Sequence, residues 1–138
     1  MASKDGMNYA PKGKENKVVE PGEFVVGVTA LDHGHINGMT NGLLEAGATI
    51  KYVYDPDAEK LKAYQEQFPD IPAAESLEQI LEDPEVQLVA AAAVPNLRSA
   101  LGNRVMRAGK DYFTEKTRFT TLEQQKEKKK VVKETGRK

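Results

Sequence analysis

Short apolar runs alternate with longer amphipathic segments along most of this sequence. The runs lie near residues 24–28, 49–54, 71–74, 88–94 and 111–114, and they are short, with β-branched, aromatic or small apolar residues typical of strands. Between them, apolar residues recur near a 3.6-residue spacing, which predicts helices at residues 35–46, 58–68, 76–82, 99–108 and 121–135. Strands that alternate with helices are joined by right-handed crossovers. We therefore predict a doubly wound parallel α/β domain, Rossmann-like, with about five strands.

The same pattern divides the chain into a tail and one domain. Residues 1–22 are polar, contain Pro11, Pro21 and three glycines, and show no sustained periodicity, so we predict a flexible tail or an expression leader there. Residues 23–138 form the predicted domain. The chain has 138 residues, of which 39% are hydrophobic, and this is enough for a single buried core.

The first strand leads into a turn that is suited to bind phosphate. The run from Phe24 to Val28 is followed by small and polar residues, with Gly34 and Gly38 at the start of the next helix. A strand that enters a helix through such a turn directs free N–H groups and the positive end of the helix dipole toward one point, where a pyrophosphate is favoured.

This turn departs from the dinucleotide motif Gly-x-Gly-x-x-Gly. The nearest residues read ALDHGH, from Ala30 to His35. Ala30 is a mild change, but Asp32 places a carboxylate where the backbone would approach phosphate, and we expect it to repel the ligand. The turn taken alone is a weak motif.

Other polar residues are expected at the same edge of the sheet. Asp55 follows the second strand about twenty residues after the turn, where an acid accepts hydrogen bonds from a ribose; as the residue before Pro56 it could equally be a helix N-cap. Pro95 and Asn96 end the strand at residues 88–94, at the carboxyl edge of the sheet or in an ordinary turn. The last strand brings Glu115 and Lys116 to that edge, where Lys116 could also be a paired surface lysine.

Several of these landmarks fall in an order that resembles the glucose-fructose oxidoreductase and inositol dehydrogenase (Gfo/Idh/MocA) family. They are the first strand and turn, Tyr54-Asp55-Pro56-Asp57, Ala93-Val94-Pro95-Asn96 and, most specifically, residues 108–116, which read AGKDYFTEK. The family typically has Glu-Lys-Pro where this chain has Glu115-Lys116-Thr117. The resemblance covers roughly residues 24–138.

The resemblance implies a function for each of these positions. The turn residues would face the pyrophosphate of NAD or NADP, Asp55 the adenosine ribose, and Pro95 and Asn96 the nicotinamide half. Glu115 would lie at the cofactor site, and Lys116 would be the catalytic residue, near the nicotinamide and a substrate hydroxyl. NAD is preferred over NADP, because Asp55 would repel a 2′-phosphate. The predicted turn residues are Ala30, Leu31, Gly34, His35 and Ile36.

Family members also carry a second α+β domain that contributes the substrate pocket. Since this sequence stops after one domain, we expect a cofactor-binding domain of an oxidoreductase without catalytic activity on its own. The alternative is a truncated or engineered Rossmann scaffold that binds no cofactor and self-associates. An exposed sheet edge after the last strand would favour a homodimer.

Composition and charge exclude several other classes. The chain has no cysteine and a formal net charge of -1, so neither a thiolate site nor a nucleic-acid surface is expected. No apolar run approaches a membrane span and no signal peptide is visible, which predicts a cytoplasmic protein with no membrane partner. Asp32, His33 and His35 form a poor metal site, because they share one loop and lack a distant fourth ligand. A signalling receiver domain would need an acidic pair and a phospho-accepting aspartate that this pattern lacks.

Overall fold

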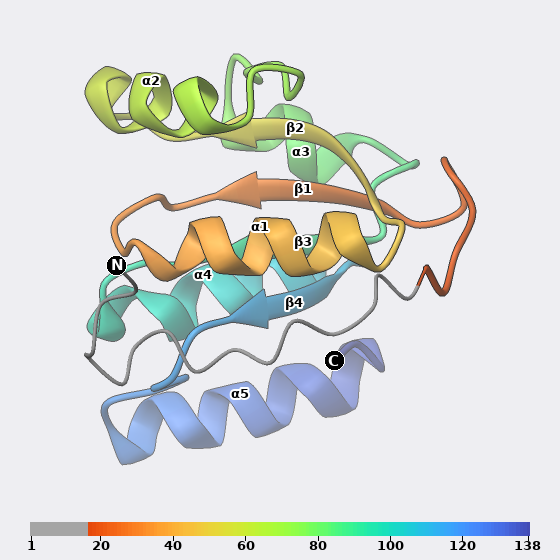
Figure 1. Cartoon of the computed structure of the whole chain (residues 1–138). Helices are drawn as coiled ribbons and strands as arrows, with labels where there is room; N and C mark the ends of the chain where they lie inside the picture. Colours follow the sequence, from red (N-terminus) through yellow and green to blue (C-terminus); the bar gives the residue numbers. More distant parts are fainter. Residues whose placement is uncertain (1–16) are drawn as a thin grey trace, which may run out of the picture.

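The computed structural model describes residues 17–138, which form a parallel sheet with helices on both faces (Figure 1). The sheet order is β2-β1-β3-β4, and every neighbouring pair is parallel. The predicted fold class is therefore confirmed. The elements are β1 (Val25–Thr29), α1 (His35–Glu45), β2 (Thr49–Tyr54), α2 (Ala58–Gln67), α3 (Leu77–Glu82), β3 (Leu88–Ala91), α4 (Pro95–Arg107), β4 (Asp111–Thr114) and α5 (Leu122–Thr135).

The segment at residues 71–74 makes a single bridge with the sheet where a strand was expected. Val53 donates its N–H to the Pro72 carbonyl at 3.0 Å, and Ala74 donates to the Val53 carbonyl at 2.8 Å, which gives a parallel bridge between Val53 and Ala73. Because Pro72 has no N–H, the segment cannot extend this pairing through it. The sheet within the described residues therefore has four strands.

The core has two parts, one on each face of the sheet. Strand β1 is buried at every position, as expected for a central parallel strand. On one face, Val26, Val28 and Ile50 pack with Ile36 of α1 and Tyr64 of α2. The opposite face is covered by α3 and α4, which contribute the buried side chains Ile80, Leu81 and Val105. Helix α5 lies beyond β4, at the side of the molecule away from α2 (Figure 1).

One helix start and one helix cap differ from the sequence-based expectation. Helix α4 begins at Pro95, although residues 95 and 96 were expected to end a strand and the helix to begin at residue 99. Proline suits the first position of a helix, because its missing N–H would have no partner there. Helix α2 is capped by Asp57, whose side chain accepts hydrogen bonds from the Glu59 and Lys60 N–H groups. The alternative that Asp55 is this N-cap was wrong.

Residues 17–22 lie against the turn between α1 and β2. The Val18 N–H donates to the Ala46 carbonyl at 2.9 Å, and the Gly22 N–H donates to Thr49 Oγ1 at 2.8 Å. The rest of the predicted tail, residues 1–16, lies outside the described residues. None of the helices in residues 17–138 is long and apolar enough to cross a bilayer.

Candidate cofactor site at the carboxyl edge of the sheet

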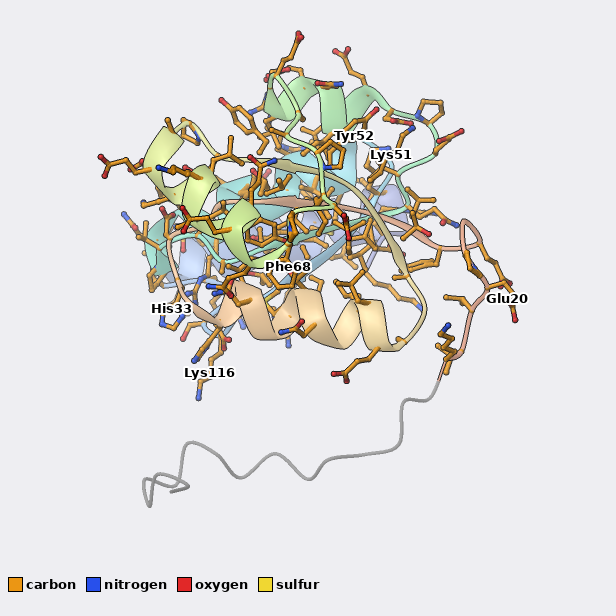
Figure 2. The ribbon with its side chains drawn as sticks, turned by 45° about the horizontal axis from the view of Figure 1, so that its top comes forward. Glu20, His33, Lys51, Tyr52, Phe68 and Lys116 are labelled. Atoms are coloured by element: carbon orange, nitrogen blue, oxygen red, sulfur yellow. The ribbon has the colours of Figure 1, made fainter. Side chains whose placement is uncertain are left out.

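From β1 the chain adds β2 on one side and then crosses over to add β3 on the other side, so the order of strands reverses between the parallel neighbours β1 and β3. Open α/β sheets bind ligands outside the carboxyl ends of the strands at such a point. Two hydrogen bonds join the loops that leave these strands, from the Ala92 N–H to the Ala30 carbonyl at 2.9 Å and from the His33 N–H to the Ala92 carbonyl at 3.1 Å. His33 and Lys116 lie at this end of the molecule, opposite Glu20 and Lys51 (Figure 2).

Most N–H groups of the turn after β1 already have hydrogen-bond acceptors within the protein. Ala30 has a φ of 54°, so the chain turns sharply where a dinucleotide motif has its first glycine. Leu31 donates to Asp55, His33 to a carbonyl and His35 to His33 Nδ1. The N–H groups of Asp32 and Gly34 have no acceptor among residues 17–138. Two free N–H donors therefore remain near the start of α1, and such donors suit an anionic group.

Asp55 connects the turn to the end of β2. Its side chain is buried, with 6% of the residue exposed. The carboxylate oxygen Oδ2 accepts from the Leu31 N–H at 2.8 Å, and Oδ1 accepts from the Asp57 N–H at 2.8 Å. Each carboxylate oxygen can accept a second hydrogen bond. Asp55 therefore fixes the turn while it keeps acceptor capacity for a hydroxyl donor.

Asp32 is held by two partners. Lys60 Nζ donates to Oδ1 at 2.7 Å, and the Val94 N–H, at the start of α4, donates to Oδ2 at 3.2 Å. The Asp32 carboxylate raises the pKa of the Lys60 ammonium above its ordinary value, because it accepts this hydrogen bond. The negative charge that was expected to repel phosphate is thus balanced by a cation from α2, which is 28 residues away in the sequence.

A cavity of about 440 Å³ opens beside Asp55. It is lined by the ends of β1 and β2 and by parts of α2, α3 and α4, so it lies at the edge where the turn and Asp55 meet. Apolar and charged side chains share the lining. They include Leu77, Leu97 and Leu101 together with Asp55, Lys60 and Arg104. A flat ring could pack on the leucines while its polar groups reach the charged side chains.

The structure brings the remaining candidate residues to this edge, although they do not all line the same cavity. Gly34 and Ile36 line a smaller cavity of about 140 Å³ between α1 and α2. Pro95 is the first residue of α4, and the Asn96 carbonyl accepts from Gln124 Nε2 at 3.1 Å. Lys116 is exposed and lines a separate cavity of about 410 Å³ between β4 and α5.

Glu115 joins the end of β4 to the first turn of α1. Its Oε2 lies 2.6 Å from His35 Nδ1, and its Oε1 accepts from the Lys116 N–H at 3.0 Å. The Lys116 N–H and then His35 lower the pKa of the Glu115 carboxyl below its usual value. His33 packs edge-on against His35, with ring centroids 4.2 Å apart. In residues 17–138, no three side chains from His, Cys, Asp and Glu converge as a metal site.

Two buried cations had no individual role in the sequence-based predictions: Arg98 lies at this edge, and Lys110 lies at the opposite end of the sheet, just before β4. Arg98 is 2% exposed; its Nε donates to the Ala93 carbonyl at 2.6 Å and its Nη1 to the Lys116 carbonyl. Lys110 donates to the carbonyls of Asp83 and Val86 at 2.7 and 2.8 Å, so the lysine of the AGK motif has a structural role. The only sequence signal for Arg98 was its place one turn after Pro95.

Comparisons with known proteins agree with this geometry. Residues 24–138 match the profile of the Gfo/Idh/MocA oxidoreductase family, described as an NAD-binding Rossmann fold. An oxidoreductase-like protein of Erwinia carotovora atroseptica is 37% identical in sequence, with a TM-score of 0.80 over 83% of this chain. A search of curated proteins found no match.

Two more distant structures share the fold. GenD2 from gentamicin A biosynthesis, solved with NAD, is 20% identical with a TM-score of 0.72 over 93% of this chain. KijD10, a 3-ketoreductase from Actinomadura kijaniata solved with NADP, is 23% identical with a TM-score of 0.68 over 86% of this chain. The chain covers 34%, 35% and 36% of the Erwinia protein, GenD2 and KijD10, respectively.

Three features are those expected of a dinucleotide fold: the parallel sheet, the turn at the point where the strand order reverses, and the buried acid at the end of β2. The profile match extends from the first strand to the last residue. The chain therefore belongs to the Gfo/Idh/MocA oxidoreductase family and contains its NAD-binding Rossmann domain.

Proposed function

We propose that this domain binds a nicotinamide dinucleotide at the carboxyl edge of its sheet, and that it binds NAD in preference to NADP. The observation that carries the proposal is Asp55, a buried carboxylate that orders the turn through Leu31 and faces a cavity of about 440 Å³. An acid at this place accepts hydrogen bonds from the ribose hydroxyls of NAD, and it repels the 2′-phosphate of NADP.

The chain's own residues divide the binding task. The free N–H groups of Asp32 and Gly34 would donate to the pyrophosphate, and Ala30, Leu31, His35 and Ile36 would shape the turn around it. Asp55 would hold the ribose, while Pro95 and Asn96 at the start of α4 would contact the nicotinamide half. The leucines of the cavity would pack against the adenine.

Lys116 and Glu115 are proposed to act at the nicotinamide end. The nicotinamide supplies hydride transfer when it is bound. A lysine charge beside a substrate oxygen would stabilise negative charge that develops on it, which makes Lys116 the proposed catalytic residue. Glu115 would position Lys116, because it accepts a hydrogen bond from the Lys116 backbone N–H. It would also position His35, because it contacts Nδ1 of the His35 ring.

We also propose that substrate recognition lies outside this domain, so that the domain alone binds cofactor without turning over a substrate. The part it shares with the three relatives is about a third of each of them.

The alternative function is a scaffold that binds no cofactor. It is supported by the turn, where three N–H groups already have acceptors within the protein and so are not free for phosphate. Self-association through the outer strand β4 stays a prediction, which light scattering would test.

Calorimetric titration of the purified chain with NADH and NADPH tests the proposal. We expect saturable binding that is tighter for NADH, and we expect Asp55→Asn to weaken NADH binding by about tenfold or more, because a charged acceptor is lost. Lys51→Met, a substitution at the opposite end of the sheet, serves as the control and should leave the affinity unchanged. No binding at millimolar cofactor would favour the scaffold.

A further inference from the structure

The cavity beside Asp55 has more negative than positive side chains. Its lining includes four carboxylates and two cations, which are Asp32, Asp55, Asp57, Glu78, Lys60 and Arg104. Both cations are already paired: Arg104 contacts Glu78, and Lys60 contacts Asp32. An additional dianionic group in this cavity would therefore meet an excess of carboxylates and no unpaired cation.

The pair between Asp32 and Lys60 joins the two segments that border the cavity. Asp32 lies in the turn after β1, and Lys60 lies in the first turn of α2, beside the N-cap Asp57. Lys60 Nζ is 2.7 Å from Asp32 Oδ1, with about two fifths of the lysine side chain exposed. The second oxygen of Asp32 accepts from the Val94 N–H, so the carboxylate is fixed on both sides.

Resting on the function proposed above, we infer that the ion pair between Asp32 and Lys60, together with Asp55, sets the choice between the two nicotinamide cofactors. NADP differs from NAD by one phosphate on the 2′ oxygen of the adenosine ribose. A domain that accepts NADP needs a free cation near the acid that holds this ribose. Lys60 is a cation that shares the cavity with Asp55, and Asp32 neutralises it.

Removal of the Asp32 charge is therefore expected to change specificity. Asp32→Asn keeps an oxygen that can accept from Val94, but it removes the ion pair and leaves the Lys60 ammonium without its partner. The lysine can then approach a 2′-phosphate, and one repelling carboxylate is gone. We expect the ratio of NADPH affinity to NADH affinity to rise on the order of tenfold.

The test is calorimetric titration of the whole chain with NADH, NADPH and the fragments 5′-AMP and 2′,5′-ADP, for the wild type and three variants. Asp32→Asn should raise the ratio of NADPH affinity to NADH affinity, and it should also raise the ratio of 2′,5′-ADP affinity to 5′-AMP affinity. Asp32→Asn combined with Lys60→Met should return both ratios to within about twofold of the wild type, because the freed lysine is absent. Thermal unfolding of each variant shows whether it is folded.

Asp83→Asn is the matched control. It removes the carboxylate that lies 2.6 Å from Lys51 Nζ. Lys51 lies at the opposite end of the sheet from the cavity (Figure 2). The net-charge change is the same, and we expect the ratio to stay constant. An unchanged ratio in a folded Asp32→Asn variant that still binds NADH would overturn this inference alone. Loss of all cofactor and fragment binding in every protein would overturn it together with the proposed function.

Discussion

The substitution Arg98→Met tests whether one buried guanidinium holds the end of β4 in place. Arg98 lies on α4 and is 2% exposed. It donates to the carbonyl of Ala93, two residues after β3, and to the carbonyl of Lys116, after β4. Methionine keeps most of the apolar stem and removes every donor, so it leaves these carbonyls without their partner.

The expected loss follows from these contacts. A hydrogen bond from a charged donor contributes about 1.5 to 3 kcal/mol, and two such bonds are lost, although water can reach the exposed Lys116 segment. We therefore expect the free energy of unfolding to fall by about 3 kcal/mol and the melting temperature by about 10 °C.

Urea unfolding followed by circular dichroism measures the change in stability. The control is Arg107→Met on the same helix, whose side chain is 53% exposed and pairs with Glu127 at 2.7 Å. We expect this control to lose less than about 1 kcal/mol. Hydrogen exchange should also be faster at residues 115–117 in Arg98→Met alone. An equal loss of stability in the two variants would show that Arg98 does not hold the end of β4 in place.

Two further predictions concern the core. In Gly27→Ala, the new Cβ would lie 2.4 Å from Ile80 Cγ2, so we expect the free energy of unfolding to fall by about 1 to 3 kcal/mol; wild-type stability in urea would contradict this. Burial raises the pKa of the Tyr64 phenol to about 12, although its hydrogen bond with Thr40 opposes the shift. The unfolded phenol ionises near pH 10 and the folded one only near 12, so stability should fall as pH rises through this window. Tyr64→Phe should show a shallower decline between pH 9 and about 11 in the same urea assay, and an identical decline would refute the assignment.

The order of strands and helices could be predicted because it depends on local hydrophobic periodicity. The start of α4, in contrast, could not be predicted. The predicted helix, residues 99–108, began late because Pro95 and Asn96 were expected to end the preceding strand, and Gly102 and Asn103 inside it are weak helix formers. In the fold, Gly102 lies against the Tyr112 ring, where an added Cβ would come within 2.4 Å of it. Close packing between α4 and β4 thus requires glycine at this position, and this packing cannot be read from the sequence.

The candidate site was predictable in outline but not in its charge balance. The interval between the turn and Asp55 pointed to one edge of the sheet, and the hydrogen bond from Leu31 to Asp55 joins them there. The sequence also indicated a repelling charge at Asp32, but its partner Lys60 lies on another element. Pairing of this kind depends on the tertiary fold, and the residues that neighbour Asp32 in the sequence do not indicate that Lys60 is its partner.

The most direct test of the account is an NMR titration of the labelled chain with NADH, read from backbone amide shifts. If the cofactor binds at the carboxyl edge, the amides of Leu31, Asp32, Gly34 and Asp57 should shift in a saturable way. Amides at the opposite end of the sheet, such as that of Lys51, should stay unchanged. Shifts confined to that opposite end, or no shifts at millimolar NADH, would contradict a cofactor site at the turn and Asp55.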